Sequence, residues 1–266
     1  MGRLEFEGKL FVVTGASSGL GREIARALAL REKAHVVVAA RRRDRLEELK
    51  AEIEARGASR VYVVPVDLAA PDGPEALYRE ARALGDVAGL VNCAGITFYG
   101  RTLEAPMETS ERLVAVNLLA PMKITMLFLR WFLERGSGAI LTVTSVTALV
   151  PLPYQSVYSA TKHGLQAFME ATAREYRGRG VALCTFAAGG MATEMSALSG
   201  LERTISLDSP FNMDPARAAR KALASFKRGK LVAIPGPLYR MVAVLLKLAP
   251  RRLVSWAVER IWAPRS

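Results

Sequence analysis

The chain has 266 residues, 51% of them hydrophobic and 23% charged, and this ordinary balance excludes a disordered or fibrous protein. Its formal net charge is +12, but residues 215–266 alone hold 12 basic residues and 1 acidic residue. Because the basicity lies in this tail, interleaved with Leu, Val and Trp, we expect no nucleic-acid partner; a nucleic-acid-binding protein driven by the tail is the alternative hypothesis.

Short β-rich runs alternate with helix-like stretches along the chain. The runs that predict strands are 10–13, 35–39, 61–66, 90–92, 140–144, 181–186 and 231–234, and the stretches that predict helices are 21–31, 43–55, 75–84, 110–135 and 157–177. Apolar strands without period-2 alternation are typical of parallel strands buried on both faces. The sequence therefore predicts an α/β fold: a Rossmann-like, doubly wound parallel sheet of about seven strands with helices on both faces.

We expect one domain over residues 1–236, with a substrate lid at about 190–215, and a helical tail over 237–266. The first residues lack the apolar stretch of a signal peptide, and the two cysteines, Cys93 and Cys184, follow no CxxC or Cys/His ligand spacing. We therefore expect a cytoplasmic protein without a metal site.

A glycine-rich turn directly follows the first predicted strand. Gly15, Gly19 and Gly21 lie in the segment Thr14-Gly-Ala-Ser-Ser-Gly-Leu-Gly, and a predicted helix begins at Gly21. Glycines permit a tight turn and a close approach of backbone to pyrophosphate, while a helix N-terminus offers unpaired N–H groups. The segment predicts a dinucleotide-binding loop. An ordinary strand-to-helix turn is the alternative, because the spacing differs from G-x-G-x-x-G.

This loop resembles the glycine motif of the short-chain dehydrogenase/reductase family. Further segments resemble family motifs in the family's order: Asp67, Asn92-Cys93-Ala94-Gly95, Asn117, Ser145 and Tyr158-Ser-Ala-Thr-Lys162. The resemblance spans roughly residues 8 to 195. It implies a nicotinamide cofactor contacted by Gly15, Ser17, Ser18, Gly19, Leu20, Gly21, Asp67, Asn92, Ala94, Gly95, Tyr158, Lys162, Gly189 and Thr193.

The choice of dinucleotide depends on charge at the end of the second predicted strand. A carboxylate there pairs with the 2′-hydroxyl of NAD, but the chain reads Ala39-Ala40-Arg41-Arg42-Arg43. Arg41 can form charge-assisted bonds to a 2′-phosphate, so we predict NADP(H) over NAD(H). The alternative is that these arginines merely begin a solvated helix. Ser18 weakens the prediction, because many NADP-preferring relatives carry a basic residue there.

Tyr158 and Lys162 lie four residues apart in a predicted helix and so share one face. Hydride transfer to a carbonyl leaves an alkoxide-like oxygen that needs a proton donor, and a neighbouring ammonium lowers the pKa of a tyrosine. We therefore predict Tyr158 as the acid/base and Lys162 as the group that tunes it. The resemblance implies that Ser145 holds the substrate oxygen and that Asn117 holds a water of the proton relay.

One segment departs from the family pattern. Where relatives have Pro-Gly after the sixth strand, the chain reads Ala188-Gly189, which frees φ and restores a backbone donor. Cofactor binding is expected to survive, because Gly189 and Thr193 remain. We predict an NADP(H)-dependent oxidoreductase acting on an apolar carbonyl or alcohol, with lipid- or steroid-like molecules among the candidates. A cofactor-binding scaffold or sensor without turnover is the alternative.

The tail carries its own pattern. Leu238–Ala249 is apolar but too short and interrupted to span a membrane, and apolar residues then recur at helical spacing after Pro250. Trp256 and Trp262 are candidate interfacial anchors on this amphipathic helix. Peripheral membrane contact or a partner surface is the prediction; packing on the domain or on a second subunit is the alternative. The resemblance also implies a homodimer or homotetramer, joined through the helices around 110–135 and 157–177.

Overall fold

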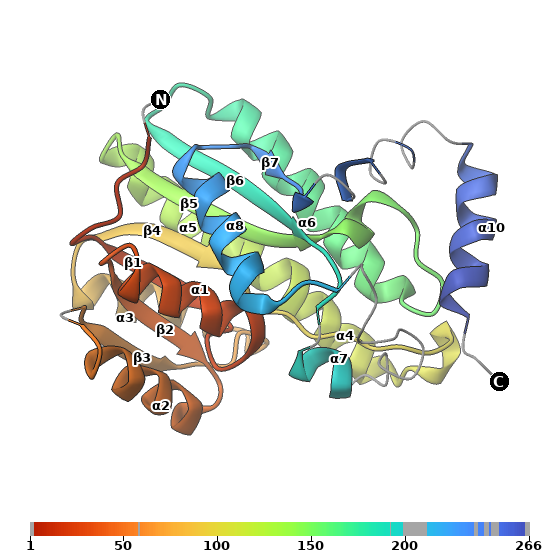
Figure 1. Ribbon diagram of the computed structural model, residues 1–266, viewed down its shortest axis with the longest axis horizontal. Helices are drawn as coiled ribbons and strands as arrows, with labels where there is room; N and C mark the ends of the chain where they lie inside the picture. Colours follow the sequence, from red (N-terminus) through yellow and green to blue (C-terminus); the bar gives the residue numbers. More distant parts are fainter. Residues whose placement is uncertain are drawn as a thin grey trace.

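The computed structural model describes residues 3–57, 59–191, 193–198, 212–236, 239–241, 245 and 250–263. A seven-stranded parallel sheet forms its centre, in the order β3-β2-β1-β4-β5-β6-β7 (Figure 1). The strands are β1 (Leu10–Thr14), β2 (His35–Ala40), β3 (Val61–Pro65), β4 (Val87–Asn92), β5 (Gly138–Ser145), β6 (Val181–Ala188) and β7 (Val232–Ala233). The order reverses between β1 and β4, which confirms the predicted doubly wound sheet.

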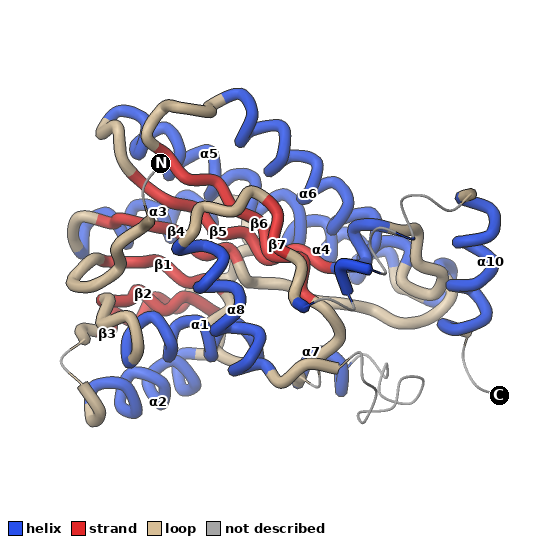
Figure 2. Tube along the Cα trace, turned by 45° about the horizontal axis from the view of Figure 1, so that its top comes forward, coloured by secondary structure: helices blue, strands red, loops and turns tan. Residues whose placement is uncertain are grey.

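Helices cover both faces of the sheet (Figure 2). One face carries α1 (Gly19–Leu30), α2 (Arg43–Glu54) and α8 (Pro215–Lys227); the other carries α3 (Gly73–Leu84), α5 (Ala120–Glu134) and α6 (Ser156–Glu175). Successive residues of a strand point to opposite faces. Val13 accordingly packs in the core beneath α1 and α8, whereas Val12 packs in the core beneath α5 and α6.

The predicted helix over 110–135 is longer and contains an irregular turn. It consists of α4 (Met107–Val114), a π-helical turn η2 (Ala115–Leu119) and α5. Residues 107–134 are long and apolar enough to cross a membrane, but half of the most apolar window is buried. Ile124, Phe128 and Phe132 are fully buried in the core beneath the sheet. This segment therefore serves as a core helix of the domain.

The shorter elements gather at the carboxyl ends of the strands (Figure 1). They are η1 (Thr102–Glu104), η3 (Val146–Leu149), α7 (Glu194–Leu198) and α10 (Arg251–Trp262). The predicted tail helix after Pro250 is confirmed as α10. In open α/β sheets a ligand binds outside the carboxyl ends of the strands, near the point where the strand order reverses. We therefore expect a ligand-binding site at this edge of the sheet.

Candidate active site

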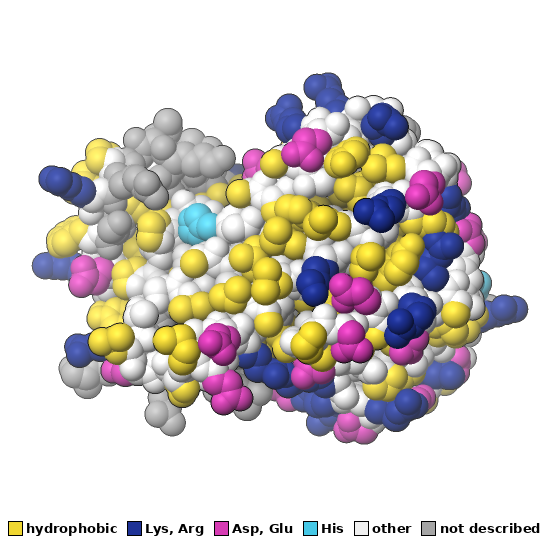
Figure 3. All heavy atoms as spheres, turned by 180° about the vertical axis from the view of Figure 1, so that it is seen from behind, with side chains coloured by type: hydrophobic (Ala, Val, Ile, Leu, Met, Phe, Trp, Pro, Cys, Tyr) yellow, Lys and Arg dark blue, Asp and Glu magenta, His cyan; other side chains and the backbone are white. Residues whose placement is uncertain are grey.

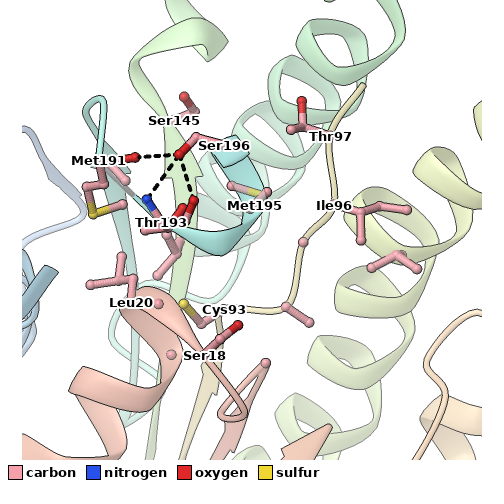
Figure 4. A pocket seen from close by; sticks show the side chains of 18 of the residues that line it. Ser18, Leu20, Cys93, Ile96, Thr97, Ser145, Met191, Thr193, Met195 and Ser196 are labelled. Carbon is pink, nitrogen blue, oxygen red and sulfur yellow. Dashed lines mark hydrogen bonds between the residues drawn. The ribbon is translucent and has the colours of Figure 1, made fainter. Parts of the chain in front are cut away.

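A cavity of about 480 Å³ opens at this edge of the sheet (Figure 4). Most residues predicted to bind cofactor or perform catalysis line it: Gly15, Ser17, Ser18, Gly19, Leu20, Gly21, Arg41, Asp67, Ala94, Gly95, Ser145, Tyr158, Lys162, Gly189 and Thr193. Asn92 and Asn117 are not among the lining residues. Segments that are far apart in the sequence therefore meet at one place.

The glycine loop has the shape that close approach to a phosphate requires. Gly15 has φ of +71°, and a Cβ placed on it would lie 2.8 Å from the Ala94 Cα. A Cβ on Gly21 would lie 2.3 Å from the Gly15 carbonyl oxygen. Ser18 precedes the first residue of α1 in extended conformation, so the helix N-terminus faces the cavity. A dinucleotide pyrophosphate fits this cradle of backbone N–H groups.

The end of the cavity near β2 and β3 carries charged side chains. Asp67 accepts hydrogen bonds from the Ala69 N–H at 3.0 Å and from Arg112 Nη2 at 2.7 Å. Burial raises the pKa of Asp67, but these two donors outweigh it and the pKa is lowered. Arg42 lies beside Arg41 in the cavity wall and donates to Ser17 Oγ at 3.2 Å. The sequence analysis predicted only Arg41 as a contact of the 2′-phosphate, although Arg42 follows it directly in the same run of arginines.

Asn92 lies beneath the cavity rather than in its wall. Its Nδ2 donates to Thr125 Oγ1 at 2.9 Å and to Thr142 Oγ1 at 3.3 Å, and its side chain is buried. It was predicted as a cofactor contact. In the structure its side chain joins β4 to β5 and α5, and the contact with cofactor stays a prediction.

Three groups converge where the reaction chemistry is expected. Tyr158 is buried, and its hydroxyl forms a hydrogen bond with the Ser145 side chain. Burial raises the pKa of Tyr158 to about 12, so the phenol keeps its proton at neutral pH. Burial lowers the pKa of Lys162 to about 8, and Lys162 Nζ donates to the Val143 carbonyl at 3.3 Å. A proton donor and a donor to an oxyanion thus face one cavity.

The segment after β6 departs from the expected loop. Ala188 is the last residue of β6 and pairs with Ser145 of β5, so it continues the sheet at the position where the family pattern has proline. A Cβ on Gly189 would lie 2.3 Å from the ring of Tyr239, a tail residue. The close approach of Tyr239 therefore requires glycine at this position. The Ser196 side chain then links Met191 and Thr193 at the start of α7 (Figure 4).

The remaining wall combines apolar side chains with a small polar pair. Its apolar members are Ile96, Val146, Met191, Met195 and Trp262. Gln155 Nε2 donates to Thr97 Oγ1 at 2.8 Å, and both residues line the cavity. Trp262, one of the two candidate interfacial anchors, lies in the cavity wall, which fits the alternative that the tail packs on the domain, and its carbonyl accepts from Tyr99 Oη at 2.6 Å. Residues 199–211 of the predicted lid lie outside the described residues.

Part of the tail faces solvent. Leu253 and Trp256 of α10 are 61% and 54% exposed, whereas Val254 is buried. The guanidinium of Arg260 lies 4.5 Å from the centre of the Trp256 ring. Figure 3, in which α10 forms the left edge, shows apolar and basic side chains together there. The helix thus packs one side on the domain and presents an apolar, basic side outward.

Several known proteins are similar to this chain. The family profile described as short chain dehydrogenase matches residues 9–203. A short chain dehydrogenase of Pseudocercospora fijiensis is 35% identical over 73% of this chain, and the match spans 63% of that protein's length. A ketoacyl reductase of Nostoc is 32% identical over 96% of this chain and 88% of its own length. A short-chain dehydrogenase of Sphingobium yanoikuyae in complex with NADPH is 27% identical with a TM-score of 0.81, covering 93% of this chain and 95% of that one.

Proposed function

Because the chain belongs to the short-chain dehydrogenase family, we propose that it is an NADP(H)-dependent oxidoreductase that interconverts a carbonyl and a secondary alcohol. The observation that carries the proposal is the convergence of Ser145, Tyr158 and Lys162 on the cavity that the glycine loop also lines. When bound, the nicotinamide supplies or accepts the hydride. The protein's own side chains supply the proton and the polar contacts.

The site favours the reducing direction at neutral pH. Tyr158 holds a proton there, since its pKa is raised, and it can give this proton to an alkoxide-like oxygen. The Ser145 hydroxyl is a second donor to that oxygen. Donors placed where negative charge develops stabilise the transition state more than the ground-state carbonyl. Lys162 adds positive charge when protonated, which favours the phenolate that remains after the transfer.

The cofactor is proposed to be NADP(H). Two guanidinium groups, Arg41 and Arg42, line the cavity at the end of β2, and the strand ends in alanines without a carboxylate. A carboxylate there would repel a 2′-phosphate, whereas guanidinium groups bind it by charge-assisted hydrogen bonds. The Sphingobium neighbour is in complex with NADPH, which supports the same choice.

The substrate is proposed to be an apolar carbonyl compound. Four apolar side chains and Trp262 line the cavity beside the hydrogen-bonded Gln155–Thr97 pair. The Nostoc relative is named a ketoacyl reductase, which supports an acyl or other lipid-like ketone. In an apolar pocket, a small number of polar groups fixes the orientation of the ligand. They do not select its exact length.

The direct test follows NADPH oxidation at 340 nm over a panel of long-chain ketones, 3-ketoacyl thioesters and steroid ketones, with NADH in parallel. We expect turnover of at least one member with NADPH, and a lower kcat/KM with NADH. Turnover of no member of the panel contradicts the substrate class, and turnover with NADH alone contradicts the cofactor choice.

We also propose a location and an assembly for the protein. We place the protein in the cytoplasm, with α10 resting on an anionic membrane through Leu253, Trp256 and the basic residues around them. Subunits are proposed to meet across α5 and α6. Met126 of α5 and Leu119 of the adjoining turn η2 are 59% and 49% exposed, and Figure 3 shows apolar side chains spread over this back face.

A further inference from the structure

One ion pair crosses the cofactor end of the cavity. Glu194, the first residue of α7, accepts two hydrogen bonds from Arg42, with Nη1–Oε1 and Nη2–Oε2 distances of 2.7 Å each. The two residues are 152 positions apart in the sequence. Such a bidentate geometry is the same one that a guanidinium uses for a phosphate. The carboxylate of Glu194 therefore occupies donors that an anionic ligand of this cavity also needs.

The surroundings of Glu194 strengthen this comparison. Its carboxylate is held by the Ser18 hydroxyl as well as by Arg42, and these donors lower its pKa to about 2. Arg42 also donates to Ser17 of the glycine loop at 3.2 Å. All four residues line the same cavity. An anion-binding corner of the cofactor site is thus filled by the protein's own carboxylate.

The pair also ties α7 to the glycine loop. Thr193 precedes Glu194, and a Cβ on Gly19 would lie 3.5 Å from the Thr193 Cγ2. The segment from Thr193 to Glu194 therefore crosses directly over the loop that a pyrophosphate would contact. Loss of the Arg42–Glu194 bond removes the stronger of the two polar contacts that hold the start of α7 there, the other being with Ser18.

We propose that Glu194 is an internal competitor of the cofactor 2′-phosphate for Arg42, and that this phosphate releases α7 when it binds. The proposal rests on the proposed NADP(H) function and adds a specificity-determining residue to it. NADH lacks the 2′-phosphate and leaves the Arg42–Glu194 bond in place. Glu194 therefore weakens NADPH binding specifically and couples it to the release of α7.

The test compares Kd values for NADPH and NADH, measured by fluorescence titration, in wild type, Glu194→Gln and Glu47→Gln. Glu47 is a matched control, because it loses the same charge on α2 and pairs with Arg43, which does not line the cavity. Glu194→Gln is expected to tighten NADPH by about two- to fivefold, the strength of a partly exposed ion pair, and to change NADH little. Glu47→Gln is expected to change neither.

Two further measurements show whether the effect passes through Arg42 and α7. In an Arg42→Ala background, Glu194→Gln is expected to lose most of its effect on NADPH. Hydrogen exchange of residues 193–198 without cofactor is expected to be faster in Glu194→Gln than in wild type, and NADPH is expected to speed exchange there in wild type.

Equal NADPH Kd values in wild type and Glu194→Gln would overturn the inference while leaving the proposed function intact. Equal tightening of NADPH and NADH would also overturn it, because Glu194 would then obstruct the shared dinucleotide cleft. If neither NADPH nor NADH binds wild type or any variant, the proposed function and the inference are overturned together.

Discussion

Asn117 and Ile96 hold one another through two hydrogen bonds of opposite direction. The Ile96 N–H donates to Asn117 Oδ1 at 2.9 Å, and Asn117 Nδ2 donates to the Ile96 carbonyl at 2.8 Å. Asn117 is fully buried and lies in the π-helical turn η2. A π-turn often marks a functional site, and this one fixes the loop that carries Gly95 and Ile96 into the cavity wall.

Substitution of Asn117 by Asp therefore tests this clamp. A carboxylate accepts the Ile96 N–H bond but cannot donate to the Ile96 carbonyl, so a buried acceptor loses its partner. We expect the free energy of unfolding to fall by about 1–3 kcal/mol, measured by urea denaturation. An unchanged midpoint and slope would contradict the assigned role.

The buried Lys162 predicts a pH dependence of stability. Its pKa is lowered from 10.5 to about 8 in the folded state. Between pH 8 and pH 10.5, Lys162 is therefore protonated in the unfolded chain and neutral in the folded chain. Unfolding takes up a proton in this window, and the contribution of Lys162 to the free energy of unfolding rises with pH from about 8 to 10.5. The contribution is fully present above 10.5 and is lost as pH falls through 8.

Chemical denaturation of wild type and Lys162→Met over this pH range measures the effect. Methionine removes the proton uptake, so the stability advantage of Lys162→Met over wild type is expected to shrink as pH rises from 8 to 10. Parallel pH profiles for the two proteins would show that Lys162 titrates at its ordinary pKa.

Close packing at Gly15 predicts a larger cost of substitution than its positive φ alone. Gly15 and Gly136 have φ values of +71° and +65°, but a Cβ on Gly136 meets nothing within 4 Å. Gly136→Ala is expected to cost about 1 kcal/mol of stability from backbone strain. Gly15→Ala is expected to cost more and to abolish NADPH binding, because its Cβ collides with the Ala94 backbone. Equal losses of stability in Gly15→Ala and Gly136→Ala, with NADPH binding intact in both, would contradict the role of Gly15 in the phosphate-binding loop.

The outer side of α10 predicts membrane affinity. In flotation assays with vesicles that contain phosphatidylserine, Leu253→Ser combined with Trp256→Ser is expected to weaken binding by about tenfold, since both apolar side chains are exposed. Leu84→Ser on α3 is the matched control for loss of an exposed leucine. Added salt is expected to weaken wild-type binding as well. Wild-type protein that stays with the soluble fraction would contradict the proposed contact.

Local patterns in the sequence predicted the doubly wound parallel sheet, the glycine loop and the Tyr158–Lys162 pair. Their signals are short-range: a spacing of four places two side chains on one helix face, and a glycine run marks a turn. α8 was not predicted as a helix. Its buried side is formed largely by Ala218, Ala219 and Ala222, and such small side chains give a weak periodic signal.

Contacts between distant segments could not be predicted in the same way. The bond from Arg42 to Glu194, the stacking of Tyr239 on Gly189 and the place of Trp262 in the cavity wall all join segments that meet only after folding. Trp262 illustrates the difficulty. Helical spacing identified its apolar face, but spacing alone does not say whether that face meets a bilayer or the protein.

The central claim is that Tyr158 donates the proton in a hydride-transfer reaction. Wild type and Tyr158→Phe are compared for NADPH oxidation at 340 nm with a ketone that the wild type reduces, and for NADPH Kd by fluorescence titration. We expect a loss of kcat by a factor of about 10² to 10⁴ with an NADPH Kd close to that of wild type. Turnover by Tyr158→Phe at the wild-type rate would contradict it.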